Sequence, residues 1–218
     1  MTEGLADDPD LAWAETPGRL SALLFQAKVA VFQARRMALD LARGLKRLEP
    51  GPAPVDWVTI GLSRTPLWSE ERSREHRHQR GKVENLRLAA AAIGQGTLPV
   101  GQVFSFWRHV GRASRRRGFV DGRMLKDGCL VPAIGGGLCQ MSNGLYDAAL
   151  QAGCDIVERH GHSRIVPGSA AEHGQDATVA WNYVDLRFKS GLPLHLEVML
   201  EPDTLVVRFR APAPPVAV

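Results

Sequence analysis

The chain has 218 residues, of which 44% are hydrophobic and 23% charged, as in folded globular domains and unlike disordered or fibrous chains. Its 27 Lys and Arg residues stand against 23 Asp and Glu residues, so the net charge of +4 does not favour nucleic acid as a partner. No apolar run has the length of a transmembrane helix, and the acidic start is unlike a secretory signal, so we expect a cytoplasmic location.

The first segment, residues 1–50, is predicted to contain an amphipathic helix. Its apolar side chains recur at helical spacing, at Leu20, Leu23, Leu24, Ala27, Val31, Ala34, Met37, Ala38 and Leu41. Lys28, Arg35 and Arg43 fall elsewhere on the helical wheel. We expect the apolar face to pack on the rest of the protein, with peripheral contact to a membrane surface as the alternative.

Residues 51–79 are predicted to be a linker, because the prolines and the glycine in "EPGPAPVDW" are followed by a crowded charged stretch. His76 and His78 lie in that stretch without a carboxylate or cysteine at ligand spacing, so we expect solvated side chains and no metal site.

Residues 80–210 are predicted to be the main domain. Apolar spacing indicates a helix over residues 80–94, followed by short strands within "VFSFW", "RGFVDGRML", "CLVPAIG", "CDIVERHGHSRIV" and "DATVAWNYVDLRF". The alternation in "LHLEVML" and "TLVVRFR" around the turn "EPD" predicts a C-terminal hairpin. The expected fold class is therefore α+β, a mostly antiparallel sheet with an embedded helix that bears a cysteine.

That helix begins within "IGGGLCQMSNGLYDAAL", residues 134–150, where three glycines precede Cys139. The expected buried stripe consists of Leu138, Met141, Leu145, Ala148 and Ala149, and Cys139 lies beside it. A thiol at a helix N-terminus is stabilised as the thiolate, which makes it a candidate nucleophile. An oxyanion or ligand site is expected around Gly136, Gly137, Leu138, Gln140 and Asn143. Cys129 and Cys154 are expected to be packing residues, and no disulfide framework is predicted from an odd number of cysteines.

A nucleophilic thiol needs a base, and "ERHGHSR" offers His160 and His162, which share one side if the strand is regular. The group that orients the imidazole could be Asp176, Asn182 or Asp185 from the next predicted strand. A metal site built from Cys139, His160 and His162 is a further alternative, although its spacing matches no standard zinc pattern, and we expect no metal or other cofactor.

The stretches "PVGQVFSFW", "RGFVDG", "AIGGGLCQMSNGLYDAAL", "VERHGHSR" and "DATVAWNYVDLRFKS" resemble the VanW family, over roughly residues 80–200. The resemblance implies a cell-wall or vancomycin-resistance context. Its G-G-G-x-C-Q pattern falls on residues 135–140, its H-S on His162 and Ser163, and its Y-x-D-L on Tyr183, Asp185 and Leu186. It thereby favours His162 over His160 and Asp185 over Asp176.

The working hypothesis is a cysteine-dependent acyl or amide transferase or hydrolase acting on a small peptide-like substrate such as a cell-wall precursor. Cys139 would attack, His162 would act as base and acid, and Asp185 would orient His162. The rival hypothesis is a non-catalytic module that binds an anionic wall precursor or a partner protein through the glycine loop and Arg115, Arg116 and Arg117. Neither hypothesis fixes an oligomeric state.

Overall fold

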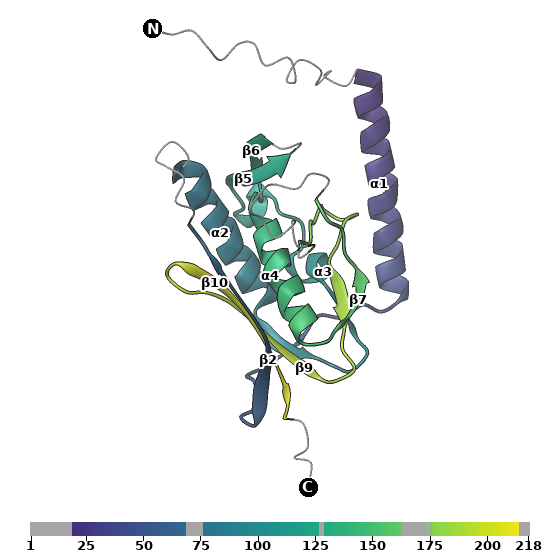
Figure 1. The fold of residues 1–218 in the computed structure, drawn as a ribbon. Coiled ribbons are helices and arrows are strands. Elements are labelled where there is room, and N and C mark those ends of the chain that lie inside the picture. Colours follow the sequence, from purple (N-terminus) through teal and green to yellow (C-terminus); the bar gives the residue numbers. More distant parts are fainter. Residues whose placement is uncertain (1–18, 69–75, 127–128, 163–173, 175, 214–218) are drawn as a thin grey trace.

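The computed structural model describes residues 19–68, 76–126, 129–162, 174 and 176–213 (Figure 1). In chain order the elements are α1 (Arg19–Ala42), β1 (Glu49–Pro50), β2 (Trp57–Pro66), α2 (His76–Ile93), β3 (Gln95–Leu98), β4 (Val103–Ser105), α3 (Phe106–Val110), η2 (Arg115–Arg117), β5 (Asp121–Lys126), β6 (Cys129–Ile134), α4 (Leu138–Gln151), β7 (Asp155–Glu158), β8 (Arg187–Lys189), β9 (Leu194–Leu200) and β10 (Thr204–Pro212). The predicted α+β class is confirmed.

The largest sheet has five antiparallel strands in the order β1-β3-β9-β10-β2. The predicted C-terminal hairpin forms its centre, with Leu205 of β10 opposite Leu200 of β9. Helices α2 and α4 pack side by side on one face of this sheet (Figure 1). The core lies between these two layers, because apolar side chains of both helices and of the two hairpin strands are buried there.

One sheet strand, β2, lies inside the segment predicted to be a linker, and it pairs with β10 along its whole length. Its inward positions carry Gly61 and Ser63 instead of large apolar side chains. A Cβ on Gly61 would collide with the backbone of Ala148 in α4, so the helix lies directly on the strand. The apolar alternation that predicts a strand is therefore missing here for a packing reason.

The smaller sheets are β4-β8-β7 and the hairpin β5-β6. Three strands are shorter than predicted. In "VFSFW" the strand ends at Ser105, whose side chain caps α3 by accepting from the Arg108 N–H. Strand β7 ends at Glu158, so His160 and His162 lie in the loop after it and not on a strand. From "DATVAWNYVDLRF" only residues 187–188 belong to a strand, β8.

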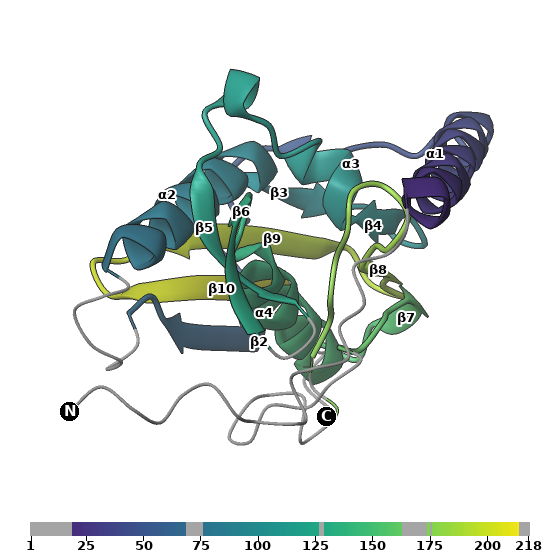
Figure 2. The same ribbon diagram turned by 90° about the horizontal axis from the view of Figure 1, so that it is seen from above.

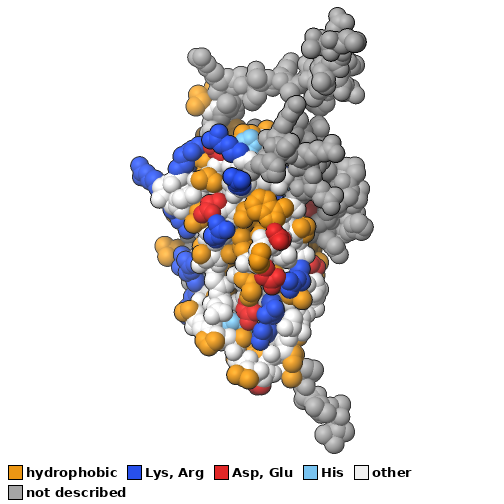
Figure 3. Space-filling model, turned by 90° about the vertical axis from the view of Figure 1, so that its left-hand side faces the viewer, with side chains coloured by type: hydrophobic (Ala, Val, Ile, Leu, Met, Phe, Trp, Pro, Cys, Tyr) orange, Lys and Arg blue, Asp and Glu red, His pale blue; other side chains and the backbone are white. Residues whose placement is uncertain are grey.

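Helix α1 lies at the edge of the molecule, on the side away from α2 (Figure 2). Among the described residues, no helix is long and apolar enough to cross a membrane. On the α2 side of the molecule, basic and acidic side chains are interspersed over the described surface (Figure 3). Helix α2 begins four residues before the predicted start at residue 80, so His78 is helical and not part of an extended H-x-H.

Candidate functional site

The three glycines before Cys139 each have a structural reason. Gly135 and Gly137 have φ angles of 77° and 100°, in the left-handed region that side chains disfavour. Gly136 lies against the backbone of Gly122 in β5, where a Cβ would collide, and its carbonyl accepts from Asn85 at 3.0 Å. The space beside Gly136 is filled by the chain itself, so the predicted ligand-binding role of this residue is not supported.

Cys139 is the second residue of α4, and its side chain is half-buried. The predicted stripe is confirmed, because Leu138, Met141, Leu145, Ala148 and Ala149 are all buried in the core. The thiol lies off that stripe, and its Sγ is 3.6 Å from the hydroxyl oxygen of Thr178. The residue that precedes the thiol is thus core, while the thiol itself faces the loop that contains Thr178.

The imidazole of His162 is held by Asp176. The carboxylate oxygen Oδ2 accepts from the His162 backbone N–H at 2.6 Å and lies 2.8 Å from the ring atom Nδ1. Asp176 is buried, whereas His162 is half-buried. Because Nδ1 binds the carboxylate, Nε2 is the ring nitrogen that can interact with the thiol. A cysteine–histidine pair requires this orientation of the imidazole.

Helix α4 also fixes the segment that carries Asp176 and Thr178. Ser142 donates to the Ala177 carbonyl at 2.5 Å, and Asn143 accepts from the Ala177 N–H at 2.7 Å. The Thr178 N–H donates to the carbonyl of His160 at 2.7 Å. The first turns of α4 therefore position the thiol and, through Ala177, also its two sequence neighbours, Asp176 and Thr178.

Arg159 is a site residue that the sequence did not indicate. Its guanidinium donates to the Asp176 carboxylate at 2.7 Å and to the Asp176 carbonyl at 2.6 Å, and it lies over the ring of Tyr146. This fixes the carboxylate on the side away from His162. The only available signal was its position within "ERHGHSR", which does not separate it from other arginines.

The electrostatics favour a charged thiolate–imidazolium pair. Burial alone would raise the pKa of Cys139, but hydrogen bonds from His162, the Val179 backbone and the Thr178 hydroxyl outweigh it and lower that pKa. Interaction with Cys139, and then with Asp176, raises the pKa of His162 to about 9 against the effect of burial. By contrast, burial raises the pKa of Cys154 to about 11, as for an inert packing cysteine.

Asp185, the predicted orienting group, lies elsewhere. Its carboxylate is fully buried and accepts from the Ser105 hydroxyl at 2.6 Å, the Trp107 N–H at 3.1 Å and Arg187 Nε at 2.8 Å. Burial raises the pKa of Asp185 despite these donors. In the structure His162 pairs with Asp176 instead. The Y-x-D-L element, through Asp185, anchors the start of α3 and Arg187.

The remaining candidates lie at other places in the fold. The His160 ring contacts Glu158 at 3.3 Å. Asn182 is buried beside a cavity of about 710 Å³ between α1 and α3. Gln140 donates to Thr65 and to the Pro66 carbonyl in β2.

Two of the amides predicted to hold an oxyanion are engaged within the chain. The N–H of Leu138 donates to Gly135 at 3.4 Å, and the N–H of Gln140 donates to Gly137 at 2.9 Å. Asn143, as described above, binds Ala177.

The arginine grip of the rival hypothesis is partly occupied as well. Arg115 pairs with Asp121, and Arg117 donates to backbone carbonyls of residues 110 and 112. Ser163 lies outside the described residues. Within the described part of the chain, no group of three or more His, Cys, Asp or Glu side chains is arranged to hold a metal ion.

Comparisons with known proteins agree on one family. The sequence profile described as "VanW like protein" matches residues 81–210. The uncharacterized protein YoaR of Bacillus subtilis is 36% identical over 138 residues, which are 63% of this chain and 42% of that protein. The vancomycin B-type resistance protein VanW of Enterococcus faecalis is 36% identical over 118 residues, 52% of this chain and 42% of that protein.

The chain thus spans less than half the length of these curated relatives. No solved structure matches it. The matched range of the family profile covers more than half of the chain and includes Cys139, His162 and Asp176, so the chain belongs to the VanW family.

Proposed function

We propose that the protein is a cysteine-dependent acyl or amide transferase or hydrolase. The observation that carries the proposal is the arrangement of Cys139, His162 and Asp176, with the thiol in the first turn of a helix and the carboxylate on the far nitrogen of the imidazole. This combination of nucleophile, base and orienting group is the one that activates a thiol at neutral pH.

In the proposed reaction the Cys139 thiolate attacks the carbonyl carbon of an amide or ester, and a C–S bond forms. The C–N or C–O bond of the substrate breaks as the His162 imidazolium gives its proton to the leaving group. Water or an amine then attacks the thioester and gives a proton back to His162, so that the thiolate is restored. Asp176 keeps the ring in one orientation and stabilises its charged form throughout.

The proposed substrate class is a small peptide-like cell-wall precursor. The support is the family, together with the name of the enterococcal relative as a vancomycin resistance protein. Because the chain covers only 42% of each relative, the activity of those whole proteins is not carried over with the family.

The first experiment needs no substrate. Alkylation by iodoacetamide is followed at each cysteine by mass spectrometry as a function of pH, in the unmodified chain and in His162→Ala. We expect Cys139 to react with a midpoint well below pH ~8.5, and the variant to raise that midpoint because burial is then opposed only by the hydrogen bonds from Val179 and Thr178. Cys154, which is buried, should stay unreactive in both and so reports that the fold is intact. An inert Cys139, or a midpoint that His162→Ala leaves unchanged, would contradict the proposal.

The second experiment tests turnover on amide and ester derivatives of wall-precursor stem peptides. Cys139→Ala should abolish release of the leaving group, whereas Cys154→Ala, a matched change at a buried cysteine, should retain it. Equal release by both variants would exclude Cys139 as the nucleophile.

One observation favours the alternative of a non-catalytic module that binds an anion. Lys82 in α2 packs against Gly137, and burial, followed by the charge of Arg123, lowers the pKa of Lys82 to about 8. An anionic group bound there would relieve that repulsion. Binding of a precursor that survives Cys139→Ser, weakens with salt and is lost in Lys82→Met would favour this alternative.

A further inference from the structure

Helix α1 is attached to the domain by its polar side. Among the α1 residues whose burial is described, those that are partly buried are Val29, Gln33, Arg36 and Asp40, which form one narrow stripe at helical spacing. Gln33 donates to the Trp181 carbonyl at 2.5 Å, and Arg36 also donates to the Tyr183 carbonyl at 3.1 Å.

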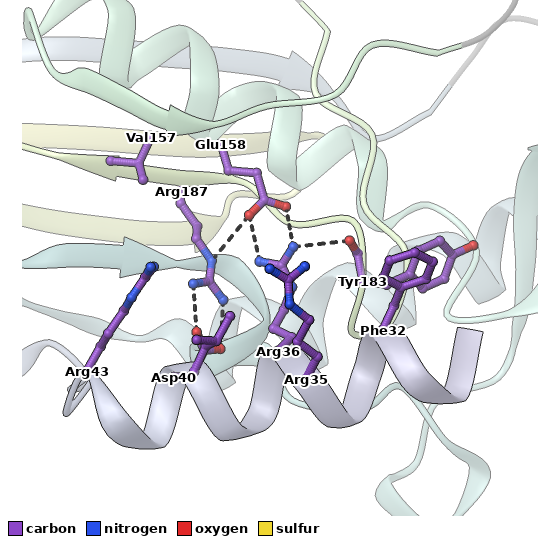
Figure 4. Close-up of a pocket in the computed structure, with 10 residues that line it drawn as sticks. Phe32, Arg35, Arg36, Asp40, Arg43, Val157, Glu158, Tyr183 and Arg187 are labelled. Atoms are coloured by element: carbon purple, nitrogen blue, oxygen red, sulfur yellow. Dashed lines mark hydrogen bonds and ion pairs between the residues drawn. The ribbon is translucent and has the colours of Figure 1, made fainter. Parts of the chain in front are cut away.

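Two bidentate ion pairs complete this attachment. Arg36 binds both oxygens of Glu158, at 2.6 and 2.8 Å, and Arg187 binds both oxygens of Asp40, at 2.7 Å. Figure 4 shows the two arginines pointing toward the two carboxylates between α1 and the strands behind it. The ion-paired side of the helix is thus the inner side, which is the reverse of the packing predicted from the sequence.

The apolar side of α1 therefore faces outward. Its large side chains have exposed fractions between 56% and 72%, at Leu20, Leu23, Leu24 and Val31, while Met37 and Leu41 border the cavity between α1 and α3. Alanines fill the helical positions between them. A continuous apolar face of this kind marks a surface that is covered in the working state of a protein.

The charges beside that face are all positive. Lys28 and Arg35 are exposed, and each follows an apolar residue of the face, Leu24 or Val31, by four positions and so lies next to it, on the flank where Arg35 also borders the pocket of Figure 4. Asp40 is the only acidic residue of α1, and Arg187 already binds it. The outer side of α1 thus combines apolar and cationic groups without a carboxylate.

We propose that this face binds the surface of an anionic lipid bilayer, with α1 lying along the interface and the domain held beneath it by the inner ion pairs. Anionic headgroups supply negative charge opposite Lys28 and Arg35, and the boundary between headgroups and acyl chains accepts the apolar side chains. A second copy of α1 would instead place its own Lys28 and Arg35 against those of the first, with no carboxylate on that side to pair with them.

The experiment measures sedimentation of the full chain with phosphatidylcholine vesicles, with and without phosphatidylglycerol. We expect binding to the anionic vesicles only. Leu24→Glu should weaken it at least about tenfold, since a leucine loses its burial. Leu192→Glu is the matched control, because Leu192 is 54% exposed and Leu24 is 56% exposed. This control should bind like the unmodified chain.

A charge pair of variants separates electrostatics from apolar contact. Lys28→Gln with Arg35→Gln should weaken binding about 30-fold. Arg77→Gln with Arg80→Gln removes the same net charge from exposed positions of α2 and should have little effect. Unchanged alkylation of Cys154 shows that each variant is folded.

Three outcomes would overturn the proposal. One is the absence of binding to anionic vesicles. Another is equal binding to neutral vesicles. The third is a dimer without vesicles that Leu24→Glu converts to a monomer, which would identify the face as a contact between two copies. None of these outcomes bears on the thiol, so they are distinguishable from a failure of the proposed function.

Discussion

Two buried carboxylates in this protein are each surrounded by donors, but the donors differ. Asp185 is bound by a serine hydroxyl, a backbone N–H and an arginine, and none of these groups faces the thiol. Asp176 is bound by an arginine and by an imidazole whose second nitrogen remains free for Cys139. The type of donor, and not burial, therefore separates a structural carboxylate from one that can take part in catalysis.

The largest effect is expected at Asp185. Asp185→Asn removes a fully buried carboxylate that accepts from Ser105, Trp107 and Arg187, and puts an amide donor in place of one of its acceptor oxygens. Arg187 keeps Asp40 and the more distant Glu158, but the buried ion pair is broken, which should lower the free energy of unfolding by about 3–5 kcal/mol. Urea denaturation followed by fluorescence measures it. In the folded variant, the pH midpoint of Cys139 alkylation should be unchanged. A shifted midpoint together with unchanged stability would mean that Asp185, and not Asp176, supports the thiol.

The pH dependence of turnover is the next largest effect. Because the pKa of His162 is raised to about 9, the imidazolium persists through neutral pH and is lost above pH 9. Acyl transfer, which needs that proton for the leaving group, should fall about tenfold for each further pH unit. Alkylation of Cys139 needs only the thiolate and should not fall. Parallel profiles for the two reactions would contradict a role for His162 as acid.

Asp176→Asn should act on the thiol more than on the fold. Loss of the carboxylate lowers the pKa of His162 and so weakens its support of the thiolate, since Asp176 is among the groups that raise that pKa. A change of one pKa unit corresponds to about tenfold less thiolate at neutral pH. Alkylation rates measure this, and Asp185→Asn is the matched control. An equal loss in both variants would remove the distinction between the two carboxylates.

Arg159→Met should have a smaller effect of the same sign. The guanidinium contacts Asp176 on the side away from His162, so its loss affects the imidazole only through the carboxylate. We expect Cys139 alkylation at neutral pH to slow by a factor of about two to five, on the scale of a partly exposed ion pair. If Arg159→Lys alkylates at the rate of the unmodified chain, the positive charge is what matters. A slowing larger than that of Asp176→Asn would contradict a role for Arg159 that acts only through Asp176.

The smallest effect is expected for an exposed carboxylate, Glu84, whose partner Arg87 is three residues later on α2. Arg87→Ala should change the free energy of unfolding by no more than about 0.5 kcal/mol. The same urea titration measures this change in the free energy of unfolding. The small change at an exposed ion pair is the reference for the much larger change expected at Asp185. A loss comparable to that of Asp185→Asn would mean that burial is not the cause of the difference.

Local periodicity determined much of this protein. The C-terminal hairpin, the helix near residues 80–94 and the buried stripe of α4 all follow from it, because a repeating apolar pattern records which face of an element is buried. The position of Cys139 beside that stripe followed from the same pattern. The family resemblance selected His162 over His160, and the structure places His162 and not His160 beside Cys139.

The tertiary structure decided what periodicity does not record. Strand β2 was not predicted, because Gly61 and Ser63 replace large side chains where α4 lies on the sheet. His162 meets Asp176, which is 14 positions later in the chain, and Asp185 is unavailable because three donors already surround it. The outward face of α1 was set by ion pairs with Glu158 and Arg187, more than a hundred positions away. Sequence patterns encode the burial of one face, whereas partners distant in the chain depend on where the fold brings them together.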